Sequence, residues 1–313
     1  MKKDQLLKFY EQGYRDFTGV DLSGVDLSRT MLIGVCLTGA NLVGTNLSRA
    51  FLTKSDLSQA NLHRANLRYA KMSETNLFRA DLSKADFDGA FMVKSQLESA
   101  NLSGANLAHV NLRSANLHCA NLCSTKLFKV NLRQANLDRA NLKWANLEQG
   151  RLTGAQLQGS LLTGVNLGQT FLIDVDLSST DLTGINFCRA ILTRANLSHS
   201  NLSCANLDSA QLRNANLNYA NLSQANLDSA QLRKGNLDNA NLTRANLQAA
   251  DLRGASLKQT NLSQVDLAQT DLAGANLESA VFDPTFKEHV LANAAKLFAA
   301  ESPQRIASQV SWA

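Results

Sequence analysis

The feature that most restricts the fold of this chain is a large apolar residue at every fifth position. Steps of five residues from Phe17 to Phe282 reach 54 positions, and 48 of them are leucine. No insertion or deletion interrupts this register. A period of five matches neither the 3.6 residues of an α-helix nor the two residues of a strand. The pattern therefore predicts a chain that turns a corner once in every five residues and points each leucine inward.

The residues around each leucine repeat as well. A small or β-branched residue stands two positions before it, with Arg15 as the one break, and Asn or Asp usually stands directly before it. Asn and Asp favour side-chain-to-backbone bonds at turns, so one of them at each corner is expected. Proline would remove a donor from a β-ladder, and none occurs before Pro284.

A second, longer period is also present. The segment ANLDSAQLR occupies residues 205–213 and returns unchanged at residues 225–233, twenty residues later. Four corners close one square coil of about twenty residues, and the next coil stacks on it through β-type hydrogen bonds. Residue i+20 is therefore expected to lie directly above residue i.

The tandem motif A-(N/D)-L-x-x over residues 15–284 resembles the pentapeptide repeat family. This resemblance implies an all-β solenoid, a right-handed quadrilateral β-helix, which here would have about 13 coils. Cyanobacterial members of the family are numerous and one is implicated in heterocyst regulation, so a cyanobacterial-type member is one option. Other members protect DNA gyrase by imitating duplex DNA.

Both ends of the repeat carry segments that are expected to cover open β-edges, which otherwise aggregate. Residues 1–14 hold a predicted capping helix over residues 3–12, residues 15–284 form the β-helix, and residues 285–313 form a C-terminal capping helix and a tail. The C-terminal helix is expected from about residue 285 to about residue 300, because Thr285 and Glu288 have capping-box spacing. It is either a cap or a dimer contact, so a monomer and a C-terminal-helix homodimer both remain open.

Composition excludes several classes of protein. The net charge of +5 is mild for 313 residues and does not argue for nucleic-acid binding. No run of about eighteen apolar residues occurs and no signal peptide is recognisable, so a cytoplasmic protein without membrane insertion is expected. The five cysteines contain no C-x-x-C pair and are expected to be free thiols.

No motif for catalysis was found. The chain lacks a P-loop, a dinucleotide-binding fingerprint and a nucleophile elbow. Stacking would place His118 between Glu98 and Asp138, but this column has no pocket that shifts pKa values. An interior filled with leucine also leaves no room for a substrate. We therefore expect a non-enzymatic chain with no catalytic residue, cofactor, metal or small-molecule substrate.

The period of twenty assigns each outward residue to a face. Among the thirteen residues that directly precede the leucine, one departs from Asn or Asp on the face beginning at Asp21, namely Leu161. One departs on the face beginning at Asp26, namely Lys126. On the face beginning at Met31, nine of thirteen depart. This third face is therefore the one that differs from the consensus.

Apolar and basic residues alternate in blocks on this face. The partner-binding candidates are Met31, Ile33, Phe51, Phe91, Val93, Arg113, Arg133, Arg151, Phe171, Ile173, Ile191, Arg213, Arg233 and Arg253. Clustered exposed apolar residues and arginines are typical of contact surfaces. The competing interpretation is that this face is merely the most strand-like, since β-branched and aromatic residues suit a flat ladder. Both interpretations remain open from the sequence.

The function that these observations favour is a non-enzymatic scaffold, with a regulatory role as one option, that presents a patterned face to another protein. The alternative is a DNA mimic acting on DNA gyrase or topoisomerase, which the net positive charge disfavours. Binding of nucleic acid through the arginine blocks is not expected, because few aromatic residues lie beside them.

Overall fold

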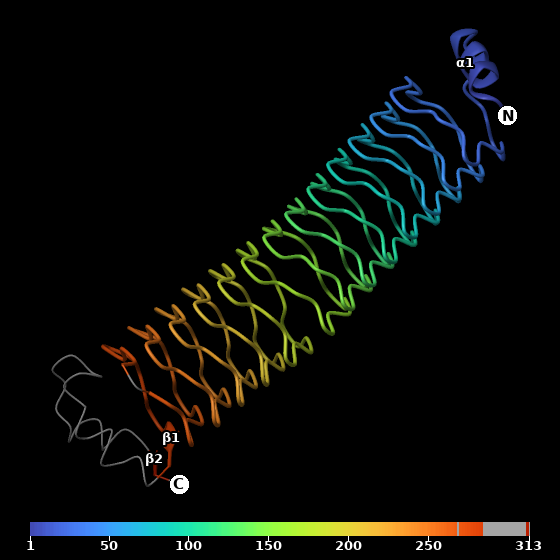
Figure 1. Ribbon diagram of the computed structural model, residues 1–313. Coiled ribbons are helices and arrows are strands. Elements are labelled where there is room, and N and C mark those ends of the chain that lie inside the picture. Colours follow the sequence, from blue (N-terminus) through green and yellow to red (C-terminus); the bar gives the residue numbers. More distant parts are fainter. Residues whose placement is uncertain (268, 284–310, 313) are drawn as a thin grey trace. The chain divides into compact units, whose positions relative to one another are not determined.

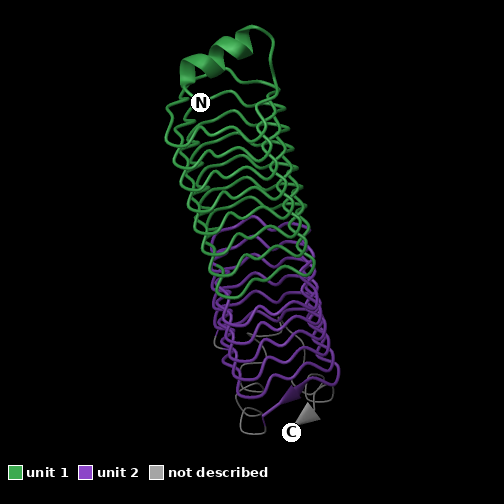
Figure 2. Cartoon of the chain, turned by 90° about the vertical axis from the view of Figure 1, so that its right-hand side faces the viewer, with its two compact units in different colours: residues 1–165 green, residues 166–313 purple. Residues whose placement is uncertain are grey.

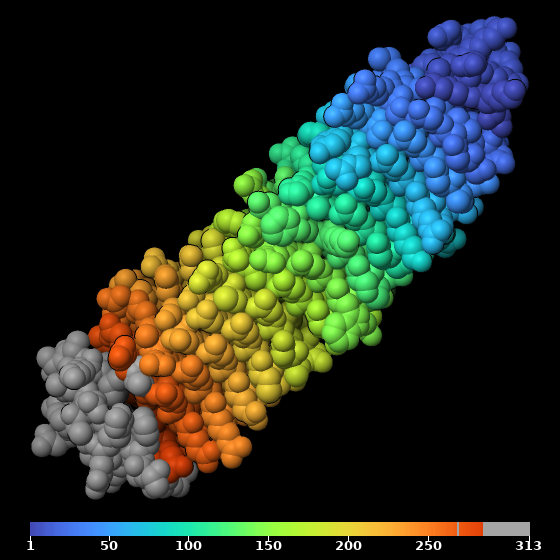
Figure 3. Space-filling model, in the orientation of Figure 1, coloured from blue at the N-terminus to red at the C-terminus, as the bar shows by residue number. Residues whose placement is uncertain are grey.

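The computed structural model describes residues 1–267, 269–283 and 311–312 (Figure 1). Its named elements are one helix, α1 (Lys3–Glu11), and two short strands, β1 (Val281–Phe282) and β2 (Ser311–Trp312). The chain divides into two units, Met1–Val165 and Asn166–Ala313, which Figure 2 distinguishes by colour. Each unit is a stack of coils, and successive stretches of sequence form consecutive bands along each of them (Figure 3).

Parallel β-bridges join residue i to residue i+20 within each unit. In unit 1, the bridges run from Asp16↔Cys36 to Asn141↔Leu161, and in unit 2 from Asn166↔Asn186 to Asn261↔Val281. A typical rung has the Leu22 amide donating to the Asn41 carbonyl at 2.8 Å, and the Asn41 amide donating to the Val20 carbonyl at 2.9 Å. The predicted twenty-residue coil is therefore confirmed.

The leucine positions form the interior of each stack. All 54 positions from Phe17 to Phe282 are buried, and the most accessible of them, Phe17, is 6% exposed. Alanine at the position two residues earlier is also buried, as at Ala40 and Ala60, with the half-buried Ala275 as the exception. Burial of a leucine side chain contributes about 1.5–3 kcal/mol, so the repeated apolar column is the main stabilising term of the fold.

Each corner is a tight turn with one residue in the left-handed region. The Ala40 amide donates to the Leu37 carbonyl at 3.0 Å, which closes the turn. The residue two positions after the leucine has positive φ, for example 57° at Lys54 and 59° at Glu74. Among the described residues, forty other than glycine adopt such angles. Left-handed backbone is costly for these residues, so the ladder hydrogen bonds must outweigh this strain at most corners.

The Asn and Asp residues have two roles. The Asn41 Oδ1 accepts the Val43 amide at 3.3 Å, which confirms the expected side-chain bond at the turn. Asparagines in successive coils also bond to one another, as the Asn121 Nδ2 does to the Asn101 Oδ1 at 3.1 Å and the Asn141 Nδ2 to the Asn121 Oδ1 at 3.1 Å. The asparagine side chains therefore stabilise the turn within each coil and also join neighbouring coils.

Different elements lie at the two ends of the described coils: a helix at the N-terminal end and a short pair of strands at the other. The helix α1, close to the predicted residues 3–12, buries Leu6, and the Tyr10 hydroxyl donates to the Ile33 carbonyl at 3.1 Å. At the other end β2 pairs in parallel with β1, with Val281 opposite Ser311. The helix predicted from about residue 285 to about residue 300 lies outside the described residues.

Candidate functional site

We use the name Met31 face for the column of residues that flank the buried leucine on one side of each coil, beginning with Met31. Parallel bridges join Met31 to Phe51, Phe51 to Lys71 and Lys71 to Phe91 in unit 1. The structure thus brings the apolar candidates of this unit into one column. They are all exposed or half-buried: Met31, Ile33, Phe51, Phe91 and Val93.

A groove of about 550 Å³ opens on this part of unit 1. We name it the Arg49 groove, and its lining residues are Arg29, Arg49, Phe51, Tyr69, Lys71 and Phe91. Three of these are aromatic, three are cationic and none is a carboxylate. Phe51 and Phe91 were predicted from the sequence as contact residues, whereas the other four residues of the groove were not.

Two of the three cations of the groove lie against its aromatic rings. The Lys71 Nζ is 3.4 Å from the centroid of the Phe91 ring, and the Arg49 guanidinium carbon is 5.7 Å from that of Tyr69. Cations within about 6 Å of a ring face are attracted by its quadrupole. The rings and the aliphatic stems therefore make apolar walls, while the charged ends retain N–H donors for a ligand.

The Tyr69 ring lies where the coil above has no side chain. Residue 89, twenty positions later, is a glycine with a φ of 69°, and a Cβ there would lie 2.5 Å from the Tyr69 Cε1. The missing side chain lets the ring lie against the backbone of that coil. Tyr69 is still 44% exposed and contributes to the wall of the groove.

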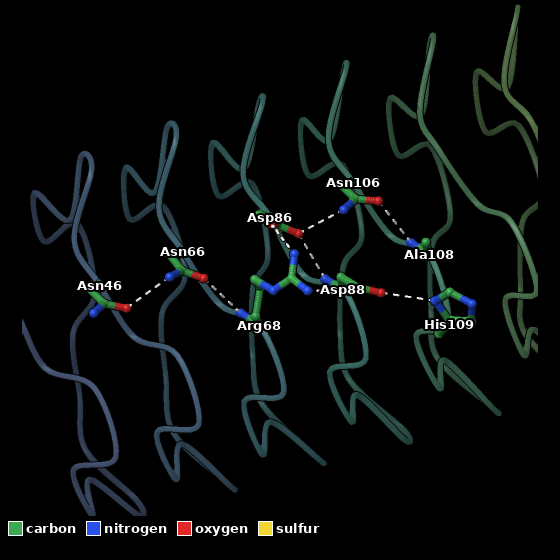
Figure 4. A network of polar contacts seen from close by, with 8 residues as sticks. All are labelled: Asn46, Asn66, Arg68, Asp86, Asp88, Asn106, Ala108 and His109. Carbon is green, nitrogen blue, oxygen red and sulfur yellow. Dashed lines mark hydrogen bonds and ion pairs between the residues drawn. The ribbon is translucent and has the colours of Figure 1, made fainter.

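The carboxylates on the neighbouring face have their own cationic partners (Figure 4). Arg68 contacts Asp86 at 3.2 Å and Asp88 at 2.8 Å, and the Nδ1 of His109 lies 3.0 Å from the second oxygen of Asp88. Hydrogen bonding to Tyr69 and to Asp86 raises the pKa of the Arg68 guanidinium. These carboxylates are therefore directed to Arg68 and His109 and do not neutralise the cations of the groove.

The basic candidates of unit 1 differ from those of unit 2. Arg113, Arg133 and Arg151 are exposed, and no ion pair involves them in the described part of the chain. Stacked arginines at about 4.8 Å spacing repel one another, so this block is the uncompensated positive segment of the Met31 face.

In unit 2, the basic block contains carboxylates of its own. Asp251 lies 2.7 Å from Arg253 and 3.9 Å from Arg233, and Asp271 lies 3.3 Å from Arg253. Asp residues of the same face therefore partly neutralise the arginines of this block. Arg213 is exposed and belongs to no ion pair among the described residues.

The apolar candidates of unit 2 also share a column. A parallel bridge joins Phe171 to Ile191. Phe171 is 37% exposed, whereas Ile173 and Ile191 are half-buried. This apolar segment is smaller than that of unit 1, and the exposed apolar surface of the Met31 face is therefore concentrated on unit 1.

The Asp251 carboxylate provides a test of these ion pairs. Two hydrogen bonds from Arg253, at 2.8 and 2.7 Å, lower the pKa of Asp251. A lowered pKa stabilises the fold above the unfolded-state value of about 3.9, and this contribution is lost as the pH falls through the folded-state value. We expect Asp251→Asn to cost about 0.2–1 kcal/mol at neutral pH and to reduce the loss of stability on acidification.

The measurement is denaturant unfolding between about pH 7 and about pH 3. Asn occurs at the equivalent positions Asn111 and Asn131, so the substitution fits the column. Asp228→Asn is the control, because its carboxylate accepts a hydrogen bond from the Ser229 hydroxyl rather than from an arginine. Equal pH profiles for the two variants would contradict a specific role of the Arg253 pair.

The structure brings no metal-binding cluster together in the residues that it describes. No cluster of three or more His, Cys, Asp or Glu side chains suited to a metal ion occurs there. In the His118 column, the Glu98 carboxylate accepts a hydrogen bond from Asn116 at 3.4 Å, and Asp138 accepts one from the Gln158 amide at 2.8 Å. None of the helices among residues 1–267, 269–283 and 311–312 has the length and apolar character of a membrane span.

Comparison with protein families gives a match to the model described as pentapeptide repeats in eight copies. The matched segments together cover residues 16–203 and 205–283. A comparison with curated protein sequences gives no match.

Several solved structures are similar to this chain. HetL, a pentapeptide repeat protein involved in heterocyst differentiation regulation from Nostoc sp. strain PCC 7120, is 28% identical, with 90% of this chain and 97% of that chain covered and a TM-score of 0.22. Rfr23 from Cyanothece 51142 is 45% identical over 30% of this chain and 64% of that chain, with a TM-score of 0.30. A protein of the Arabidopsis thaliana thylakoid lumen is 28% identical over 37% of this chain and 77% of that chain, with a TM-score of 0.26.

Proposed function

This chain belongs to the pentapeptide repeat family, whose fold is a right-handed quadrilateral β-helix, and from that premise we propose that it is a non-enzymatic scaffold that binds another protein through its Met31 face. The observation that carries the proposal is the gathering of exposed Met31, Ile33, Phe51 and Phe91 on one column of unit 1. On the Asp21 face, the residues directly before the leucine are Asn or Asp with the single exception of Leu161. Exposed apolar clusters of this kind mark contact sites.

The basic residues fit the same role. Arginine and aromatic side chains are enriched in protein interfaces, and both occur on the Met31 face of unit 1. A scaffold without catalytic residues acts through the activity of its partner, so the proposal includes a regulatory role. A cytoplasmic location also belongs to the proposal. It rests on the five cysteines, which are all free in the structure.

The experiment is site-specific photo-crosslinking in the native cell. Phe51 is replaced by p-benzoylphenylalanine, and the matched control carries the same replacement at Phe78, a half-buried phenylalanine on the face beginning at Asp16. We expect a discrete protein adduct from position 51, at least about fivefold more abundant than from position 78, because only the first lies on the proposed contact surface.

The adduct is identified by mass spectrometry, and the purified partner is then titrated against the wild type and against Phe51→Asn combined with Phe91→Asn. Asn is the residue of the same column at Asn111 and Asn131, so the fold should persist. We expect the double substitution to weaken binding at least about tenfold. Unchanged binding, with a small change in stability, would support the strand-like interpretation of the face instead.

A further inference from the structure

We propose that the Arg49 groove binds an extended acidic segment of the partner protein, with carboxylates of that segment meeting Arg29, Arg49 and Lys71. This inference rests on the proposed function and names the chemical class of the partner at one site. Its first support is charge. Three of the six lining residues are cations, none is an anion, and the nearby Asp86 and Asp88 are held by Arg68.

The second support is the shape of the site. Phe51 and Phe91 lie on the same column two coils apart, a separation of about 9.6 Å, with Lys71 between them. Arg29 and Arg49 follow one another along the adjacent edge at one coil spacing, about 4.8 Å. An extended chain rises about 3.3 Å per residue and turns alternate side chains to the same side. Such a segment can place carboxylates on the cations and apolar side chains against the rings.

The ring contacts favour carboxylates over nucleobases. Single-stranded nucleic acid binds to aromatic platforms whose faces are free to stack with bases. Here the Lys71 ammonium stands 3.4 Å from the Phe91 centroid, and two guanidinium groups, of Arg49 and Arg68, stand 5.7 Å from that of Tyr69. Base stacking on these faces would displace the protein's own cations, whereas a carboxylate uses the N–H donors that the cations already present.

The test uses a fluorescein-labelled peptide of about ten residues in which glutamate and valine alternate, because valine favours the extended conformation. Binding is measured by fluorescence anisotropy to the full chain. The groove variant combines Arg49→Ser with Lys71→Asn. Ser209 and Ser229 occupy the equivalent corner of other coils, and Asn111 the equivalent ladder position, so both substitutions follow the repeat.

The control variant combines Arg189→Ser with Lys126→Asn. It makes the same two chemical changes and removes the same charge. Arg189 lies in the same corner column as Arg49, and Lys126 lies at a ladder position of the Asp26 face. We expect the groove variant to weaken peptide binding at least about tenfold and the control variant no more than about twofold. Binding of the wild type should weaken as salt rises from about 50 mM to about 300 mM, because the contacts are between charges.

Three results would overturn the proposal. The first is equal loss of binding in the groove and control variants, which would indicate attraction by net charge alone. The second is absence of peptide binding to the wild type. The third is tighter binding of a thymidine oligonucleotide that the groove variant abolishes, which would assign the groove to single-stranded nucleic acid. A protein adduct from position 51 together with absent peptide binding would leave the scaffold function standing and refute only the acidic class of partner.

Discussion

Deletion of residues 205–224 is expected to give a folded protein with one coil fewer, in which every column of side chains continues. The deletion joins Cys204 to Ala225, which occupies the same repeat position as Ala205. The Leu202 amide, which donates to the Asn221 carbonyl at 2.7 Å, would then meet the equivalent carbonyl of Asn241. Solenoid stability is close to a sum over coils and their interfaces, so the loss of one coil should lower the thermal midpoint by only a few degrees.

Removal of residues 205–209 alone should have a different effect. Leucine would still follow every five residues, so the interior would survive, but every later column would move by one side of the square. In the intact chain the Arg194 amide donates to the Arg213 carbonyl at 3.0 Å, so residues 193 and 213 are neighbours. After the twenty-residue deletion, residue 233 takes the place of residue 213 and becomes the neighbour of residue 193. After the five-residue deletion, it does not.

The formation of a disulfide between two introduced cysteines distinguishes the two deletions. Thr193→Cys and Arg233→Cys are introduced together in a background where the five native cysteines are replaced by serine. Neighbouring ladder positions about 4.8 Å apart lie within the range of a disulfide. We expect oxidation to crosslink the pair after deletion of residues 205–224, and in neither the undeleted chain nor the five-residue deletion. A crosslink in the five-residue deletion, or unfolding of both deletions, would contradict the four-sided coil.

Much of the fold was predictable because the repeat is strict. An inward residue every five positions and a copy every twenty determine the coil, and bridges such as Asp21↔Asn41 confirm it. The bonds of Asn to the turn were predictable from local chemistry. The amide column between coils, such as the bond from Asn121 to Asn101, was not predicted, because it depends on how far apart the stacked side chains lie.

The corner backbone could not be predicted from residue preferences. Positive φ normally favours glycine, yet Arg64, Trp144 and Glu74 adopt it at φ angles from 57° to 61°. The corner must turn wherever the leucine register requires, and hydrogen bonds to the next coil hold it in that conformation. Residue identity at these positions is therefore free to vary, and this freedom allows corner residues to take on other roles.

The Arg49 groove was missed for this reason. The pattern that defines the Met31 face lies in the residues next to each leucine, whereas Arg29, Arg49 and Tyr69 stand two positions after a leucine, at the edge of this face. One signal was present, namely a large aromatic residue followed by glycine after twenty residues. Tyr69 lies against Gly89 in this way, and a Cβ on the glycine would come within 2.5 Å of the ring.

The DNA-mimic alternative gains no support from the arrangement of charge. A mimic of duplex DNA needs a continuous acidic side. Instead, several carboxylates of unit 2 are neutralised by arginine, as Asp174 is by Arg194 at 2.6 Å and Asp251 by Arg253 at 2.7 Å. With a net charge of +5, the chain would repel a DNA-binding surface rather than occupy it.

The adjacent residues Leu161 and Leu162 should respond very differently to the same substitution. Leu161 is the one departure from Asn or Asp on the Asp21 face and is 47% exposed, whereas Leu162 belongs to the interior column and is 4% exposed. We expect Leu162→Ala to lower the free energy of unfolding by about 2–5 kcal/mol, because it removes buried methyl groups and leaves a cavity. Leu161→Ala should change it by no more than about 0.5 kcal/mol.

Denaturant unfolding measures the global effect, and hydrogen exchange of the Ala145 and Leu142 amides measures the local effect, because long repeat arrays need not unfold in one step. The Ala145 amide donates to the Leu142 carbonyl within a turn, and the Leu142 amide donates to the Leu161 carbonyl in the ladder. Similar losses for the two variants would contradict the assignment of Leu161 to the surface. A loss of stability for Leu161→Ala that grew with protein concentration would indicate that a second copy of the chain covers Leu161, since self-association makes stability depend on protein concentration.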